Sequence, residues 1–323
     1  MPINEVTEAL VRHRRFLLTS HYNPDGDNIA SQLALASILT SLNKQVAIVD
    51  QDPVPGRYRF LPGWESVSNQ IVPQNASCAV VLDCGNIDRI GRVSDIITPA
   101  TMEIINIDHH ISNNRYGHFH YVDPGASSTS ELVLRLAQKL RVKPDPDQAQ
   151  IILTGMMADT GGFRYASTSA DTLRAAGLLS DYGAKIAEVA EQLYYQQPIN
   201  QLKILGELLS RLKTGAKGKL AYMSLTQELI KRYDFDLSES EEFVKYALAV
   251  KGAEVAILFK EQADGIVRVS FRGKGRVDVN QLAGKFGGGG HVSAAGARLN
   301  TTLDDAVQKV VQMAEAELGA MVE

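Results

Sequence analysis

The chain has 323 residues, a formal net charge of −4 at pH 7 and 45% hydrophobic residues. This length exceeds what one hydrophobic core usually organises, so we expect two domains. The composition is typical of a globular protein, and the lack of net positive charge argues against tight binding of long nucleic acids, long DNA included. No apolar run approaches the roughly 20 residues of a membrane span, so we expect no membrane partner.

The N-terminal segment and the cysteines predict the cellular compartment. Residues 1–15 show neither the apolar core nor the small-residue cleavage site of a signal peptide. The two cysteines, Cys78 and Cys84, have neither the spacing of a metal site nor that of a disulfide framework. We therefore expect buried thiols in a reducing cytoplasm.

The first half of the chain predicts alternating helices and strands. A short amphipathic helix over residues 5–13 precedes a strand over residues 16–20, and a helix over residues 28–42 follows. Further apolar runs rich in Val and Ile occupy residues 45–50, 78–82 and 102–107. Such runs are typical of a parallel sheet flanked by helices on both faces, and we expect an α/β domain with five parallel strands.

Helical patterns dominate the middle of the chain. Ser128-x-x-Glu131 predicts a capping box that opens a helix to about residue 140. Residues 127–130 are therefore interpreted as structural, because capping satisfies free amide groups without any catalytic role. Further helices are expected immediately before Asp159 and over residues 169–182, 185–195 and 199–212.

A change in composition marks the second domain. Gly and Lys dominate residues 213–219, where the apolar periodicity stops. We expect a first domain over residues 1–190, a helical linker over 191–218 and a smaller α/β domain over 219–323. In the last of these the pattern predicts strands near residues 220–225, 255–260 and 266–271, and helices near 226–233, 239–250, 278–286 and 303–318.

Acidic and imidazole side chains follow three of the predicted strands. They are His21, Asp25 and Asp27 after the first strand, Asp83 after the strand over 78–82, and Asp108, His109 and His110 after the strand over 102–107. Because ligands of parallel sheets collect at the carboxyl ends of the strands, we expect these side chains to lie at one edge. Asp159, just before a Gly-Gly turn, is a further candidate carboxylate.

Six of these side chains form a candidate metal site, namely His21, Asp25, Asp27, Asp83, His109 and Asp159. Imidazole nitrogens and carboxylate oxygens suit Mn²⁺ or Mg²⁺ better than an ion that seeks thiolates. Six ligands exceed the needs of one ion but suit two ions that share a carboxylate. Two-metal sites activate water and stabilise in-line displacement at phosphorus, so the joint pattern predicts phosphoester hydrolysis. A single Asp after a strand is more often a cap or a turn former.

The motifs together resemble a known superfamily. In chain order they are His21-x-x-Pro-Asp-Gly-Asp27, Asp83-Cys-Gly, Asp108-His-His, Ala158-Asp-Thr-Gly-Gly-Phe163, and Phe286-Gly-Gly-Gly-Gly-His291 followed by Ala294-Ala-Gly. This set resembles the DHH phosphoesterase superfamily with its DHH-associated C-terminal domain. The compact two-domain form is similar to the NrnA-like oligoribonuclease and pAp phosphatases, and to standalone phosphodiesterases that degrade pApA or cyclic di-AMP.

The resemblance implies a role for each residue of the first domain. His21, Asp25 and Asp83 would hold one Mn²⁺ ion, and Asp83 would bridge to a second ion held also by Asp27, His109 and Asp159. His110 would contact the scissile phosphate and protonate the leaving oxygen. Asp108 would orient its neighbours rather than bind metal.

The resemblance also implies a substrate-binding role for the second domain. Four consecutive glycines allow close approach to a phosphate, and their amides can form an anion-binding nest. Arg272 can bind phosphate through two parallel hydrogen bonds, although relatives often show Arg-Ser where this chain has Arg272-Gly273, so a hydroxyl contact is lost. The expected substrate-binding residues are Arg272, Lys274, Gly288, Gly289, Gly290 and His291.

The implied function is that of a metal-dependent phosphodiesterase that acts as a cytoplasmic homodimer. Its substrates would be short RNA oligonucleotides, dinucleotides such as pApA, and pAp. The motifs leave a cyclic di-AMP phosphodiesterase open. A manganese inorganic pyrophosphatase shares the first-domain pattern, but a basic Ser-Arg-Lys-Lys type cluster would be expected in place of the glycine-rich motif. A noncatalytic nucleotide-binding regulator would normally lack a metal ligand, and here all six are present.

Overall fold

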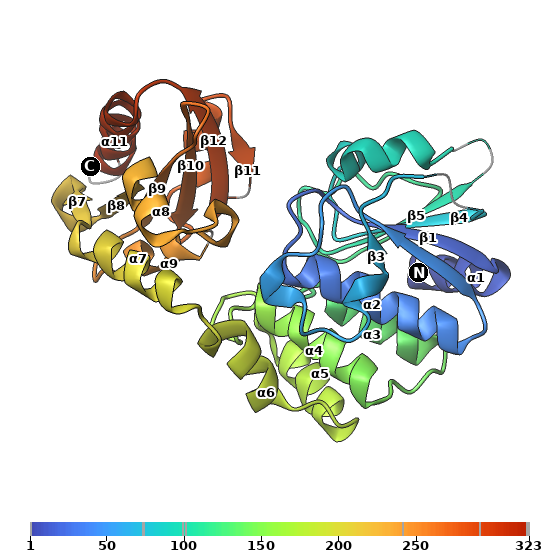
Figure 1. Cartoon of the computed structure of the whole chain (residues 1–323). Helices are drawn as coiled ribbons and strands as arrows, with labels where there is room; N and C mark the ends of the chain where they lie inside the picture. Colours follow the sequence, from blue (N-terminus) through green and yellow to red (C-terminus); the bar gives the residue numbers. More distant parts are fainter. Residues whose placement is uncertain are drawn as a thin grey trace. The chain divides into compact units, whose positions relative to one another are not determined.

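The computed structural model describes residues 2–72, 75–98, 100, 102–240, 242–290 and 292–320. Contacts divide the chain into two compact units, Met1–Gln196 and Gln197–Glu323 (Figure 1). The division falls inside the predicted linker, and α7 (Ile199–Ser210), which the sequence assigned to that linker, packs into a core of the second unit. In the described part of the chain, no helix combines the length and apolar character needed to cross a membrane.

The first unit contains a six-stranded, wholly parallel sheet with the order β3-β2-β1-β4-β5-β6. Its strands are β1 (Arg15–Thr19), β2 (Gln45–Val49), β3 (Val67–Ser68), β4 (Cys78–Leu82), β5 (Glu103–Asp108) and β6 (Phe119–Val122). The predicted parallel α/β fold is confirmed, but the predicted count of five strands is wrong. The shortest strand, β3, has only two residues, which is too short for an apolar pattern to be recognised.

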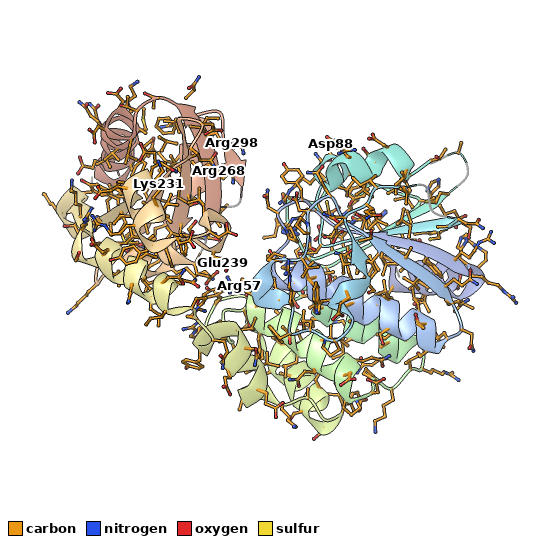
Figure 2. The ribbon with its side chains drawn as sticks, in the orientation of Figure 1. Arg57, Asp88, Lys231, Glu239, Arg268 and Arg298 are labelled. Atoms are coloured by element: carbon orange, nitrogen blue, oxygen red, sulfur yellow. The ribbon has the colours of Figure 1, made fainter. Side chains whose placement is uncertain are left out.

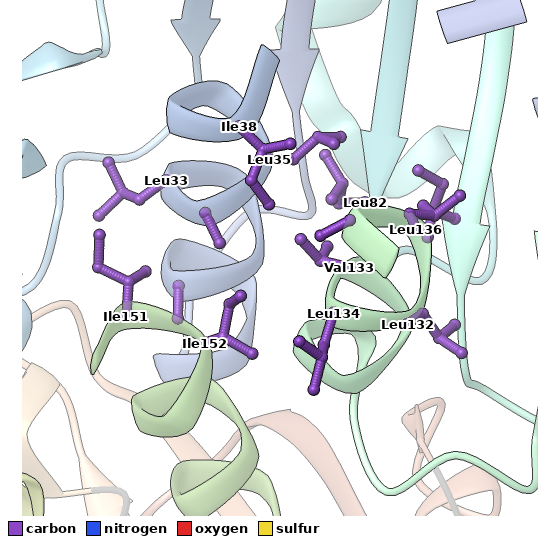
Figure 3. Close-up of a cluster of buried hydrophobic side chains, with 14 of the residues drawn as sticks. Leu33, Leu35, Ile38, Leu82, Leu132, Val133, Leu134, Leu136, Ile151 and Ile152 are labelled. Carbon is purple, nitrogen blue, oxygen red and sulfur yellow. The ribbon is translucent and has the colours of Figure 1, made fainter. Parts of the chain in front are cut away.

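Helices lie on one face of this sheet. They are α1 (Pro2–Arg12), α2 (Gly26–Ser41), α3 (Thr129–Lys139), α4 (Pro146–Asp159), α5 (Ala170–Asp181) and α6 (Ile186–Ala190), which a π-helix (Glu191–Tyr195) extends. The first three contact the strands, and α4 to α6 pack on α2, α3 and one another. Figure 3 shows Leu35 of α2, Val133 of α3 and Ile152 of α4 in the same buried cluster as Leu82 of β4. This packing fixes the helix ends that lie beside the carboxyl edge of the sheet.

A 3₁₀ segment, η3 (Ile87–Ile96), covers the opposite face. Its Ile90 and Val93 join a second cluster with Leu17 of β1 and Val81 of β4. The sheet is therefore buried on both faces, as continuously apolar parallel strands require. Two shorter 3₁₀ turns, η1 (Gly56–Tyr58) and η2 (Trp64–Ser66), lie between β2 and β3.

The second unit has a mixed six-stranded sheet with the order β11-β12-β10-β9-β8-β7. Its strands are β7 (Lys213–Gly215), β8 (Leu220–Leu225), β9 (Val255–Glu261), β10 (Ile266–Gly273), β11 (Gly289–Gly290) and β12 (Ala294–Asn300). Only β8 and β9 pair in parallel among them. The helical elements are α8 (Gln227–Tyr233), α9 (Phe243–Leu248), α10 (Val279–Gly284) and α11 (Leu303–Ala320), with 3₁₀ turns at Ala216–Gly218 and Leu237–Ser240.

Two separate cores lie against the two faces of this sheet. On one face Val267, Val269 and Phe271 of β10 pack with α10 and α11. On the other face Ala256 and Leu258 of β9 pack with α7, α8 and α9. Because side chains alternate along a strand, the even-numbered residues of β10 point to the side on which α7 to α9 lie.

We expect Leu35→Ala to lower the free energy of unfolding of the first unit by about 2–5 kcal/mol, because Leu35 is fully buried and leaves a cavity. The only tryptophan, Trp64, packs against the same core, so its fluorescence during urea unfolding reports on this unit. The control is Leu173→Ala on α5, whose side chain is 54% exposed and whose loss should cost less than about 0.5 kcal/mol. Equal urea midpoints for the two variants would contradict this packing.

Candidate active site

The turn from β1 to α2 positions the first three candidate ligands. Asp25 is the N-cap of α2, and its Oδ1 accepts the amide N–H of Asp27 at 3.1 Å. Asp27 is buried in the first helical turn, where it accepts the amides of Thr129 at 2.7 Å and Ser130 at 2.9 Å. The nearby His21 ring places Nδ1 2.8 Å from the carbonyl of its neighbour, which turns Nε2 the other way. Asp25 and Asp27, which are only two residues apart, therefore have different surroundings.

Asp83 lies between two imidazoles. It follows β4 in the left-handed backbone region, with φ 51°, where Asp is enriched among residues other than glycine. Its Oδ2 lies 3.8 Å from Nε2 of His21, and its Oδ1 lies 3.6 Å from Nε2 of His109. Thr129 also donates its hydroxyl to Oδ1 at 3.0 Å. The two oxygens of one carboxylate therefore face different parts of the site.

All six candidate ligands come together at the carboxyl edge of the sheet. Asp159, the last residue of α4, completes the set with its Oδ2 3.4 Å from Nε2 of His109. Three groups have potential ligand atoms that all lie within 4.8 Å of one another: His21, Asp25 and Asp83; Asp27, His109 and Asp159; and Asp83, His109 and His110. Nitrogen and carboxylate donors in these combinations could hold a divalent metal ion.

Asp108 and His110 form a separate pair beside these groups. Asp108 is buried, and its Oδ1 lies 2.6 Å from Nδ1 of His110 and accepts the amide of His109 at 2.9 Å. Its other oxygen accepts the side-chain amide of Asn113 at 2.5 Å. Because Nδ1 of His110 is engaged by Asp108, a proton that this ring passes to a ligand has to leave from Nε2.

Burial and charge shift the pKa values of the site strongly. Burial raises the pKa of Asp27, Asp83 and Asp159 to about 7, and repulsion between neighbouring carboxylates adds to this effect. Burial alone would lower the pKa of His110, but its hydrogen bond to Asp108 and the charge of Asp83 outweigh burial and raise it to about 10. A cation bound among these carboxylates would stabilise their ionised forms.

The second unit places Arg272 near the end of β10 and Lys274 directly after this strand. Arg272 is half-buried and donates from Nη1 to the carbonyl of Phe271 at 3.0 Å, while Lys274 is exposed. Arg272 pairs with Ala294 of β12. His291 lies outside the described residues, so its predicted role stays a prediction.

The amides of the glycine-rich segment donate hydrogen bonds within the protein, whereas the sequence predicted that they bind an anion. The amides of Gly287, Gly288 and Gly290 donate to the carbonyls of Gly284 and Ala283 and to Oδ1 of Asn280, respectively. The prediction of an anion-binding nest is therefore wrong for these three amides. A Cβ on Gly288 would lie 2.1 Å from the carbonyl oxygen of Gly296, so this glycine permits the close approach of the segment to β12.

Comparisons with known proteins agree with the motifs. The profile of the DHH family, N-terminal domain, matches residues 15–156, and the profile of the DHHA1 domain matches residues 201–320. The bifunctional oligoribonuclease and PAP phosphatase NrnA of Thermus thermophilus is 36% identical over 304 residues, which cover 93% of this chain and 89% of that protein. The chain belongs to the DHH family.

Two further relatives of this DHH protein are informative. The crystal structure of an exopolyphosphatase-related protein from Bacteroides fragilis matches with a TM-score of 0.93 at 29% identity, covering 100% of this chain and 98% of that chain. The cyclic-di-AMP phosphodiesterase PdeA of Listeria monocytogenes is 24% identical and covers 96% of this chain, but only 48% of that protein is matched. The match to the DHH and DHHA1 profiles confirms the predicted family.

Sequence reasoning missed the contribution of the N-terminus of α3 to the DHH site. Residues 127–130 were interpreted as structural, yet Thr129 contacts both Asp27 and Asp83. The predicted capping box is only half formed: Ser128 accepts the amide of Glu131 at 3.1 Å, but the Glu131 carboxylate accepts the amide of Ser127 instead of that of Ser128. The sequence did contain a signal for this contribution. A helix cap needs one hydroxyl residue, whereas the start of α3 has a run of them.

We expect Gly155→Ala to weaken metal binding, because a Cβ at this position of α4 would lie 1.9 Å from Oγ of Ser130 and 2.8 Å from Oδ1 of Asp27. Moving these groups out of contact should reduce the affinity for Mn²⁺ by about 10-fold or more, in the range seen when residues that orient metal ligands are changed. Gly177→Ala on α5 is the matched control, since nothing lies within 4 Å of its Cβ. Calorimetric titration of metal-free protein measures both affinities, and equal values would contradict the crowding.

We expect metal-free protein to lose stability as the pH rises from about 5 to 8. The pKa values of Asp27, Asp83 and Asp159 rise from 3.8 to about 7 on folding, so between these limits the folded state binds more protons than the unfolded state, and stability falls with pH. Mn²⁺ binds the ionised carboxylates and should raise the melting temperature more at pH 8 than at pH 6. At 100 times its Kd the ion should contribute about 2.7 kcal/mol.

Thermal unfolding in EDTA or in excess Mn²⁺, at both pH values, measures these effects. Asp83→Asn should flatten the pH dependence and reduce the response to Mn²⁺, whereas Asp171→Asn on the exposed surface of α5 should change neither. A stabilisation by Mn²⁺ that does not grow between pH 6 and pH 8 would contradict the assignment of the buried carboxylates.

Proposed function

We propose that this DHH protein is a metal-dependent phosphodiesterase that releases mononucleotides from short oligoribonucleotides, pApA included, and also dephosphorylates pAp. The convergence of two imidazoles and four carboxylates at one edge of the sheet is the main observation that supports this proposal. The Thermus relative, which is named as a bifunctional oligoribonuclease and PAP phosphatase, supports the class of substrate.

The proposed cofactors are two Mn²⁺ ions, for which Mg²⁺ could substitute. His21 and Asp25 would hold one ion, and Asp27, His109 and Asp159 the other. The two oxygens of Asp83 face His21 and His109, which supports a bridging role for this carboxylate. Bound ions of this kind lower the pKa of water and stabilise the charge that develops during in-line displacement at phosphorus.

His110 is the proposed general acid. Asp108 holds Nδ1 of its ring, and the raised pKa keeps the imidazole protonated at neutral pH. Nε2 then delivers its proton to the ribose oxygen that leaves when the bond to phosphorus breaks. Asp108 is the proposed positioning residue, since its buried oxygens are occupied by His110, Asn113 and the amide of His109.

The second unit is proposed to bind the nucleotide. Arg272 and Lys274 supply positive charge for phosphate, and an arginine can bind two phosphate oxygens at once. Gly289 and Gly290 present exposed backbone without side chains, next to the tightly packed Gly288, and His291 is included from the resemblance.

The proposed enzyme works in the cytoplasm as a homodimer. Cys78 and Cys84 are buried free thiols, which supports a reducing compartment. The dimer rests on the resemblance to NrnA-like proteins. Cyclic di-AMP is retained as an alternative substrate because the Listeria relative named as its phosphodiesterase matches nearly the whole of this chain.

Steady-state kinetics with Mn²⁺ on pApA, pentanucleotide RNA, pAp, cyclic di-AMP and pyrophosphate test this proposal. We expect AMP to be released from pApA and pAp with higher kcat/KM than product from cyclic di-AMP or pyrophosphate. His110→Gln should lower kcat on pApA by about 10²–10⁴-fold, as loss of a general acid does, while the melting temperature in Mn²⁺ still rises. Asp171→Asn should leave kcat unchanged.

Two results would overturn parts of the proposal. Preferred hydrolysis of cyclic di-AMP or pyrophosphate would reject the assigned substrates. Unchanged turnover by His110→Gln would reject the proton donor, and a loss of Mn²⁺-induced stabilisation in this variant would assign His110 to metal binding instead.

A further inference from the structure

Three cationic side chains stand side by side across three neighbouring strands of the second unit. In the antiparallel register, Arg268 of β10 pairs with Lys260 of β9 on one side and with Arg298 of β12 on the other. Residues directly opposite one another have Cβ atoms about 4.5–5.5 Å apart and point to the same face. Figure 2 labels Arg268 and Arg298 on this sheet. Arg268, Lys260 and Arg298 are called the cationic row below.

The cationic row lies on the same face of the sheet as Arg272. Val267, Val269 and Phe271 are buried under α10 and α11, so the alternating residues of β10 point to the other face. Arg268 and Arg272 are both half-buried there. Positively charged side chains therefore occur at two places along one face of β10.

The residues between these two places have small side chains or none. Ser270 lies between Arg268 and Arg272 on β10, and its partner on β12 is Gly296, which has no side chain. Arg272 pairs with Ala294. At about 3.4 Å per residue, the Cα atoms of Arg268 and Arg272 are about 14 Å apart. An extended chain could pass over Ser270 and Gly296 and contact a cation at each end.

The three cations of the row differ in exposure. Lys260 is only 7% exposed, which is unusual for lysine, and Arg268 is half-buried, whereas Arg298 is exposed and accessible to a ligand. A phosphate bound at the exposed end of the row would gain charge-assisted hydrogen bonds.

We propose that the cationic row binds a backbone phosphate of an oligoribonucleotide, at least one nucleotide away from the phosphate that Arg272 contacts. The inference rests on the proposed function, because it assigns the second phosphate site to the same substrate. Proteins that bind single strands commonly follow the backbone with a line of positive charge. The row makes the enzyme favour substrates with more than one internucleotide phosphate.

The variants Arg298→Gln and Arg268→Gln/Arg298→Gln test the row. Their matched control is Lys309→Gln, which removes one exposed charge from α11 on the opposite face of the sheet. The substrates are a pentanucleotide RNA and the dinucleotide ApA, whose one phosphate is the one hydrolysed. We expect Arg298→Gln to raise KM for the pentanucleotide by about tenfold or more, because one charge-assisted hydrogen bond is lost, with kcat unchanged.

The KM for ApA should stay within about twofold of the wild-type value in the same variant. Loss of one phosphate contact should also reduce the slope of log KM against log salt concentration for the pentanucleotide by about 0.7. Circular dichroism establishes that each variant is folded, and the single variant Arg298→Gln decides the question if the double variant unfolds.

The outcomes separate this inference from the proposed function. If wild-type protein releases no mononucleotide from the pentanucleotide, the proposed function fails. If the wild type is active but Arg298→Gln matches Lys309→Gln in KM and in salt dependence, the row does not bind substrate. An equal rise in KM for ApA and for the pentanucleotide also overturns the inference, because ApA has no second phosphate.

Discussion

The burial of three neighbouring carboxylates is the constraint on which the first unit depends. The carboxyl edge of the parallel sheet gathers Asp27, Asp83 and Asp159, and their pKa values of about 7 show how poorly burial tolerates their charge. Two features of the protein reduce the free-energy cost of burying these charges. Amides at the start of α3 donate to Asp27, and imidazoles lie near Asp83. Neither feature neutralises the full charge, so a bound cation would stabilise the fold and create the catalytic centre together.

Another buried carboxylate, that of Glu131, holds the start of α3 in place. Glu131 accepts the amide of Ser127 at 3.1 Å and the hydroxyl of Thr172 on α5 at 3.0 Å. Arg135 joins Glu131, at 2.5 Å, to Asp123 after β6, at 2.6 Å. A carboxylate with this many donors has little freedom to move. Groups on α3 and α5 and after β6 thus fix the two amides that orient Asp27, although none of these groups belongs to the family motifs.

The metal site could be predicted because one topological rule brings its residues together. The strands β1, β4 and β5 are neighbours in the sheet, so residues that follow them meet although they are far apart in sequence. The role of Thr129 was missed, because a helix cap already accounts for hydroxyl residues at the start of α3. Strand β12 was missed because Ala-Ala-Gly-Ala lacks the β-branched residues that indicate strands, and its pairing with β10 and β11 determines its conformation. The cationic row depends on that same pairing.

A net charge of −4 averages over local surfaces of opposite sign. Carboxylates gather at the edge of one sheet, while arginines and a lysine gather on a face of the other. Proteins that bind long DNA tightly neutralise about 6–10 phosphates. The cations proposed to bind substrate are fewer, namely Arg272, Lys274 and the three residues of the cationic row. So small a number of contacts agrees with the proposed preference for substrates a few nucleotides long, which must leave after each cleavage.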